Sequence, residues 1–212
     1  MNKLVISLLA VLLIFSLQIK AQKDTIPQDD LLGSLTSDSS VQQKLLPDHM
    51  IFTQRLLWGE KGLMRSFNAF ELTPEKRAKE LKLRRTMLVT HQILGAVTSL
   101  GMIGQGYVGS KLINGDQGIK DLHEGLAAGV NIGYFTTASL SLFAPPKMLN
   151  ERKGYSSIKV HKYLAIIHLA GMIATNILAD MTEGNLKMQK IHRAVAFTTF
   201  GAFLAAEVVI KF

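Results

Sequence analysis

Four histidines recur at nearly even intervals in the second half of the chain, each close to the start of an apolar segment. The intervals between successive members are 32, 38 and 31 residues, about one membrane-spanning helix plus one loop. An ionisable side chain is costly in hydrocarbon, so one that lies inside a span is a candidate functional residue. The four are His91, His123, His161 and His192.

Successive antiparallel helices would arrange these imidazoles as two pairs. The first and third would lie at one membrane face and the second and fourth at the other, on the order of 20 Å apart. Zinc usually takes four ligands, and no acidic residue stands regularly beside the histidines. A b-type haem needs only two axial nitrogens, one on each side of its plane. Because a helix N-terminus favours the neutral, metal-binding form of imidazole, the pattern favours a haem cofactor.

A small residue follows each of these histidines after four positions. Residues i and i+4 share a helix face, so a small side chain there would leave room for a planar ligand. His168 lies two turns deeper than His161 and is followed by Met172 instead. It could bond to a cofactor edge, serve as an alternative ligand, or bond to a neighbouring helix. The small residues are Gly95, Ala127, Ala165 and Ala196.

An ordinary explanation also exists for any single one of the four histidines. Histidines near helix ends often lie at the membrane–water boundary, where they bond to lipid headgroups or loops. The matching depth of all four, each followed by a small residue, favours the cofactor interpretation.

Four apolar segments carry these histidines, at residues 87–108, 122–144, 160–179 and 191–210. Each is long enough to cross about 30 Å of hydrocarbon as an α-helix. The short polar connections between them force neighbouring helices to run antiparallel. The sequence therefore predicts an all-α, integral membrane, up-down four-helix bundle in residues 87–212. Polar side chains within it, Gln105, Asn131 and Asn176, are expected to bond between helices.

The composition agrees with a membrane protein. The 212 residues are 48% hydrophobic, with a formal net charge of +8, and the mean hydropathy is +0.21. The basic residues form short runs beside the apolar segments, which suits anionic lipid, and no motif indicates nucleic-acid binding. The absence of cysteine excludes disulfides, thiolate-ligated clusters and covalently attached c-type haem.

The first 86 residues divide into three parts. Residues 1–21 have a basic start, an apolar run and Ala21 at a plausible cleavage point, which predicts a secretory signal peptide; an uncleaved anchor is the alternative. Residues 22–45 form a polar linker. Residues 46–86 predict an extramembrane helical segment, either an amphipathic helix at the interface or a small packed cap. Within it, Thr73 and Pro74 start a helix that continues into the first span.

Two signals for membrane orientation disagree. A cleaved signal peptide puts the N-terminal segment outside the cytoplasm, whereas the Lys and Arg residues at 76–85 favour the cytoplasmic side. We give precedence to the signal peptide because it initiates insertion. The expected location is a bacterial inner membrane with the N-terminal segment outside.

The stretches "THQILGAVTSLGMIGQG", "LHEGLAAG", "VHKYLAIIHLAGM" and "KIHRAVAF" resemble the helix starts of the cytochrome b561 family. The chain is similar to a divergent, bacterial-type member over residues 87–210, chiefly in the order and spacing of its histidines. The resemblance implies two bis-histidine b haems, one on His91 and His161 and the other on His123 and His192. It also implies electron transfer between a donor and an acceptor that the residues do not identify, with a partner redox protein as one candidate.

Two other functions are compatible with the same residues. One is a haem-free membrane scaffold or complex subunit with incidental interface histidines. The other is a proton or metal transporter that uses the histidines as a relay.

Overall fold

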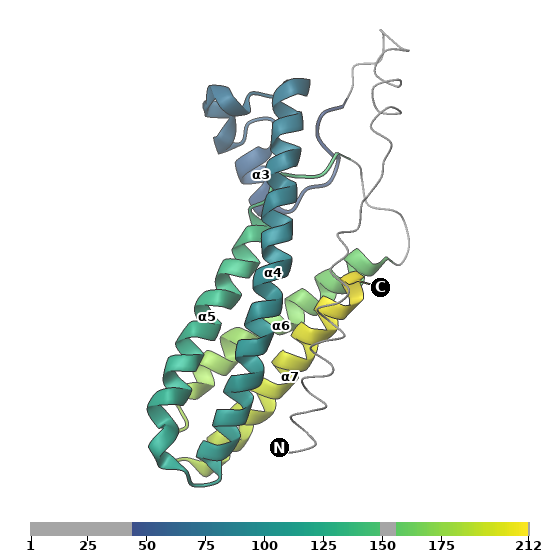
Figure 1. The fold of residues 1–212 in the computed structure, drawn as a ribbon. Helices are drawn as coiled ribbons and strands as arrows, with labels where there is room; N and C mark the ends of the chain where they lie inside the picture. Colours follow the sequence, from purple (N-terminus) through teal and green to yellow (C-terminus); the bar gives the residue numbers. More distant parts are fainter. Residues whose placement is uncertain (1–43, 149–155, 212) are drawn as a thin grey trace. The chain divides into compact units, whose positions relative to one another are not determined.

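The computed structural model describes residues 44–148 and 156–211, so the expected signal peptide and residues 22–43 of the expected linker lie outside the described residues. The described residues contain helices and no strand, which confirms the all-α prediction. The elements, in chain order (Figure 1), are α3 (Phe52–Trp58), the short 3₁₀ helices η1 (Leu63–Ser66) and η2 (Asn68–Phe70), α4 (Pro74–Ile113), the 3₁₀ helix η3 (Gln117–Ile119), α5 (Lys120–Leu142), α6 (Ser157–Ala179) and α7 (Leu186–Lys211).

Helix α4 begins as predicted. The hydroxyl of Thr73 accepts a hydrogen bond from the backbone N–H of Lys76 at 3.3 Å, and Pro74 occupies the first turn. The helix then continues without interruption for 40 residues. A helix of this length is about 60 Å long, roughly twice the thickness of bilayer hydrocarbon. Its N-terminal part therefore extends beyond any membrane that its apolar part crosses.

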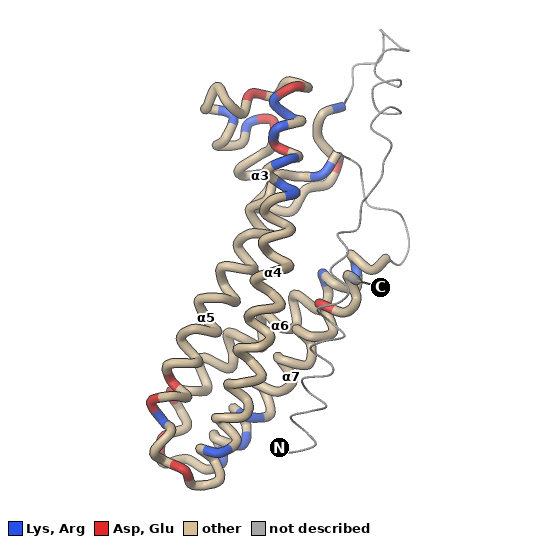
Figure 2. The backbone as a smooth tube through the Cα atoms, viewed as in Figure 1, with Lys and Arg blue, Asp and Glu red and all other residues tan. Residues whose placement is uncertain are grey.

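Three helices, α4, α6 and α7, are long and apolar enough to cross a membrane, which indicates a membrane protein. No more than 22% of the residues in the most apolar stretch of each are buried within the protein, so most apolar side chains face outward. Charged residues gather in the N-terminal region and at the ends of these helices, and long central stretches carry none (Figure 2). Lipid is the environment that suits such surfaces.

The fourth expected span, residues 122–144, differs from the other three. It forms the 23-residue helix α5, which is long enough to cross, but it falls short of the others in hydropathy. Three glycines, Asn131 and several Ser and Thr residues replace the aliphatic side chains that the other three helices carry.

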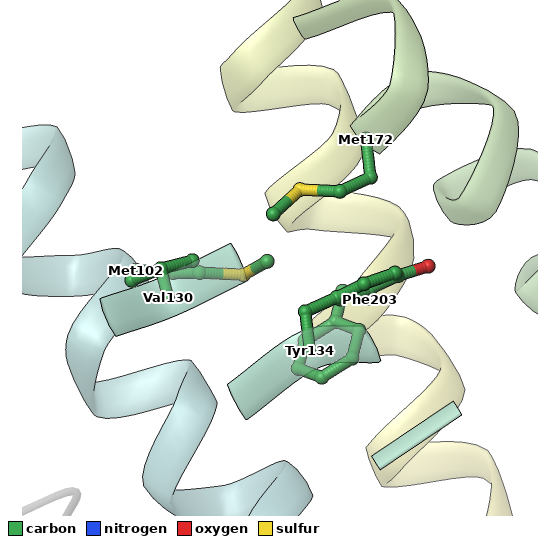
Figure 3. Close-up of a cluster of buried hydrophobic side chains, with 5 residues drawn as sticks. All are labelled: Met102, Val130, Tyr134, Met172 and Phe203. Carbon is green, nitrogen blue, oxygen red and sulfur yellow. The ribbon is translucent and has the colours of Figure 1, made fainter. Parts of the chain in front are cut away.

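The long helices form two hairpins, α4 with α5 and α6 with α7, and α4 also packs against α7. Side chains from all four meet in one hydrophobic cluster (Figure 3). Tyr134 is the most deeply buried member, with 1% of its surface exposed. The members of this cluster are Met102, Val130, Tyr134, Met172 and Phe203.

The two hairpins repeat one pattern. An offset of 70 residues relates α4 to α6, and 69 residues relate α5 to α7. These offsets superpose the histidines of one hairpin on those of the other, and they pair Met102 with Met172 and Tyr134 with Phe203. The cluster therefore combines two copies of one helix–helix contact.

Residues 46–72 form a small packed cap rather than one interfacial helix, so the second sequence alternative is the observed one. We use "the cap" for residues 52–70, which comprise α3, η1 and η2. Arg65 holds them together because its guanidinium donates to the carbonyl oxygens of Trp58 at 2.6 Å and Phe70 at 2.5 Å. Arg65 also forms an ion pair with Glu80 of α4, which ties the cap to that helix.

Glu80 binds a second guanidinium, that of Arg77, at 2.6 Å. Both side chains are buried, with 0% of Glu80 and 1% of Arg77 exposed. Burial lowers the pKa of Arg77, and the hydrogen bond and negative charge of Glu80 offset part of that effect.

The cap and α4 also bind the C-terminal end of α5. The last carbonyl groups of a helix lack partners within it, and here side chains from the preceding segment supply donors. These bonds fix the end of α5 against α4. The pairs are Thr53 with Leu142 (2.6 Å), Trp58 with Phe143 (2.9 Å), Arg84 with Pro145 (2.6 Å) and Arg77 with Pro146.

Candidate functional site

The first and third histidines face each other between α4 and α6. The ring centroids of His91 and His161 lie 6.2 Å apart, and the ring planes are nearly perpendicular, at 83°. This confirms the expectation that these two histidines meet at one end of the helices. We call this pair level A.

Both level A rings are held by the main chain of a neighbouring helix. The Nδ1 atom of His91 bonds to the carbonyl oxygen of Thr137 in α5 at 2.8 Å, and that of His161 bonds to the carbonyl oxygen of Ala206 in α7 at 2.9 Å. A carbonyl oxygen only accepts, so Nδ1 carries the proton and donates it. The Nε2 atom of each neutral ring therefore keeps its lone pair, as in a metal-binding histidine.

The second and fourth histidines form level B, and only one of them is held in the same way. The Nδ1 atom of His192 donates to the carbonyl oxygen of Thr175 at 3.1 Å. The Nε2 atom of His123 instead accepts a hydrogen bond from the side-chain amide of Gln105 at 3.3 Å. Its Nδ1 atom is buried and has no hydrogen-bond partner among the described residues. Level A is thus fully prepared to bind a ligand, whereas level B is half prepared.

The three acceptor carbonyls share one register. Each belongs to the residue 14 positions after a histidine of its own helix: Thr137 after His123, Thr175 after His161, and Ala206 after His192. Fourteen helical residues rise about 21 Å. Each helix therefore carries a histidine at one level and a supporting carbonyl about 21 Å away at the other, which agrees with the spacing expected from the sequence.

The small residues at i+4 have different surroundings. A Cβ atom added at Gly95 would lie 3.1 Å from Oε1 of Glu207 and 3.8 Å from Cγ2 of Thr137, so those side chains occupy the space beside it. The three alanines, Ala127, Ala165 and Ala196, are half-buried. That all four border a cofactor stays a prediction.

His168 bonds to a neighbouring helix, the third of the alternatives left open by the sequence. Its Nδ1 atom lies 2.6 Å from the hydroxyl of Tyr134 in α5. Its ring also packs edge-on against the rings of Tyr134 and Phe203, with centroids 5.6 and 5.1 Å away. The environment of His168 thus differs from that of the other four histidines, since its Nδ1 partner is a side chain of the buried core.

Sequence reasoning missed one ionisable group near level A. Glu207 of α7 accepts a hydrogen bond from the hydroxyl of Ser99 in α4 at 2.7 Å. The available signal was a lone acidic residue late in the fourth apolar segment. The expected amide contacts were correct: Asn131 and Asn176 bond reciprocally between α5 and α6 at 2.8 Å, and Gln105 reaches from α4 to α5.

Residues 44–148 and 156–211 contain no group of three or more His, Cys, Asp or Glu side chains that could hold a metal ion. A site with only two protein ligands, such as level A, is smaller than such a group. Comparison of the chain with protein-family models, with curated proteins and with solved structures gives no match. The resemblance stated above therefore depends on the residues themselves.

Gly109 offers a test of level B. A Cβ atom added there would lie 2.8 Å from Cε1 and 3.2 Å from Nδ1 of the His123 ring. We expect Gly109→Ala to displace this ring and to lower any ligand binding at level B at least tenfold, with level A unchanged. Gly104→Ala is the matched control, because an added Cβ there has no described atom within 4 Å. Titration of the apoprotein with haemin would measure both variants, and equal affinities at both levels would contradict this use of Gly109.

Proposed function

We propose that α4–α7 cross the membrane as an up-down bundle that binds two b-type haems and carries electrons between its two faces. His91 and His161 would hold one haem, and His123 and His192 the other. The relation between His91 and His161 carries this proposal. An imidazole nitrogen lies about 2 Å from a metal that it binds, and the ring centre lies about 1 Å beyond, so two axial rings are centred about 6 Å apart. The observed separation is 6.2 Å.

The supporting hydrogen bonds favour the same function. The carbonyl groups of Thr137 and Ala206 keep the proton on Nδ1, fix the orientation of each ring and make its Nε2 atom more basic. When bound, a b-type haem accepts and releases one electron at its iron. At level B, His123 would exchange its bond with Gln105 for the metal.

The less apolar helix α5 fits the bundle as its fourth span. Its charged residues lie in its first turns, at the end of the helix. Two of its polar residues point at other helices, Tyr134 to His168 and Asn131 to Asn176. Polar side chains that bond within a bundle are tolerated in membranes. The outward faces of the helices would contact lipid, in a bacterial inner membrane with the N-terminal segment outside the cytoplasm.

The visible absorption spectrum of the purified full chain tests this function. We expect sharp ferrous bands typical of paired imidazole ligands, and two haems per chain. A variant with His161→Ala and His192→Ala should be colourless although still helical by circular dichroism. A colourless wild-type protein, purified after expression with ample haem, would exclude electron transfer by haem and leave the scaffold or transporter functions.

A further inference from the structure

Glu207 lies where it can act on level A and not on level B. Its Oε1 atom is 3.1 Å from the Cβ position of Gly95, one helical turn after His91. The preceding residue, Ala206, supplies the carbonyl oxygen that holds His161. The carboxylate is therefore beside the supports of both level A rings and about 21 Å along the helix from His192.

The bond from Ser99 indicates an ionised carboxylate. The hydroxyl of Ser99, itself buried with 6% of its surface exposed, donates to Oε2 of Glu207 at 2.7 Å. A short hydrogen bond of this type stabilises negative charge. Charges act strongly at such a site because the surrounding dielectric constant is low.

Level B has neutral groups in the corresponding region. The described side chains that bond between helices near it are the amides of Gln105, Asn131 and Asn176. The nearest described carboxylate of its own helices, Glu124, is exposed and lies 3.7 Å from Lys120. The repeat offset of 69 residues relates Glu207 to Ala138, so the second hairpin carries a charge that the first lacks.

We propose that Glu207 makes the two haem sites unequal by holding the level A haem at the lower midpoint potential. This inference rests on the two-haem function proposed above. A nearby carboxylate stabilises the ferric state, which carries one more positive charge than the ferrous state. Electrons then move from level A to level B. Level A is at the end of the helices where the cap binds α5, so the transfer runs away from the cap toward the turn that contains η3.

Redox potentiometry on the full chain, loaded with haem in detergent, tests the inference through midpoint potentials rather than turnover. Wild-type protein should titrate in two steps. Glu207→Gln, which keeps the shape and removes the charge, should raise the lower step and leave the upper one in place. Glu124→Gln is the matched control and should move neither step. His161→Ala assigns the steps, because it should delete the one that responds to Glu207→Gln.

A transplanted charge gives an independent arm, which also serves if Glu207→Gln does not fold. Ala138→Glu combined with Ala165→Gly copies the Glu207–Gly95 pair onto the other hairpin, and it should lower the same step further. Two haems whose lower step moves in neither variant would overturn the role of Glu207 and leave the two-haem function intact. A wild-type chain that binds no haem would overturn both proposals.

Discussion

Replacing His161 with alanine is expected to remove one of two haems, so that the haem content falls from two to one per chain. His161 and His91 supply the two axial nitrogens of level A, and loss of either leaves an iron with one protein ligand. The bond from His161 to the carbonyl of Ala206 shows that its Nε2 atom, rather than Nδ1, would be lost as a ligand. Haem absorbance after extraction, divided by protein concentration, measures this ratio.

His168→Ala is the informative control, because this ring is in the same helix and is also buried. We expect it to keep both haems, since its Nδ1 atom bonds to Tyr134 and its ring packs in the hydrophobic cluster. A change in midpoint potential is the effect expected from its removal. Equal haem loss in His161→Ala and His168→Ala would contradict the assignment of His161 as a ligand.

Glu80→Ala is expected to give the largest loss of stability, about 3–5 kcal/mol in the free energy of unfolding. The substitution leaves the guanidinium groups of Arg65 and Arg77 without the carboxylate that compensates their buried charges. Because Arg77 also bonds to Pro146, the connection between the cap and the end of α5 should loosen as well.

Thermal unfolding of the solubilised protein, followed by circular dichroism, measures this loss. Glu60→Ala is a suitable control because Glu60 is an exposed acidic residue of the cap region. A midpoint for Glu80→Ala within the error of that for Glu60→Ala would show that the buried ion pairs do not stabilise the fold. The level A spectrum should also broaden in Glu80→Ala, since α5 carries the carbonyl that holds His91.

The long helices were predictable because their signals are local. Hydrophobic length located α4, α6 and α7, and the cap residue Thr73 with Pro74 marked the start of α4. The fold of the cap was not predictable from periodicity. Its short helices are held by Arg65, whose partners at residues 58, 70 and 80 are brought together only by the tertiary structure.

The candidate site divides in the same way. Helix reversal was sufficient to pair His91 with His161, because alternate antiparallel helices start at the same face. The partner of His168 and the place of Glu207 were not predictable, since both depend on the rotation and axial offset of one helix against another. A sequence fixes neither quantity until side chains pack.

Three of the four imidazoles are oriented by main-chain oxygens, at residues 137, 175 and 206. Because the backbone supplies these acceptors, the side chains at those positions can diverge in evolution without loss of the bond. A slide of one helix by a single residue is another matter, since it moves each acceptor by about 1.5 Å and rotates it by about 100°. The geometry of the rings is thus robust to substitution at these positions but sensitive to insertion or deletion of one residue between a histidine and its distant carbonyl.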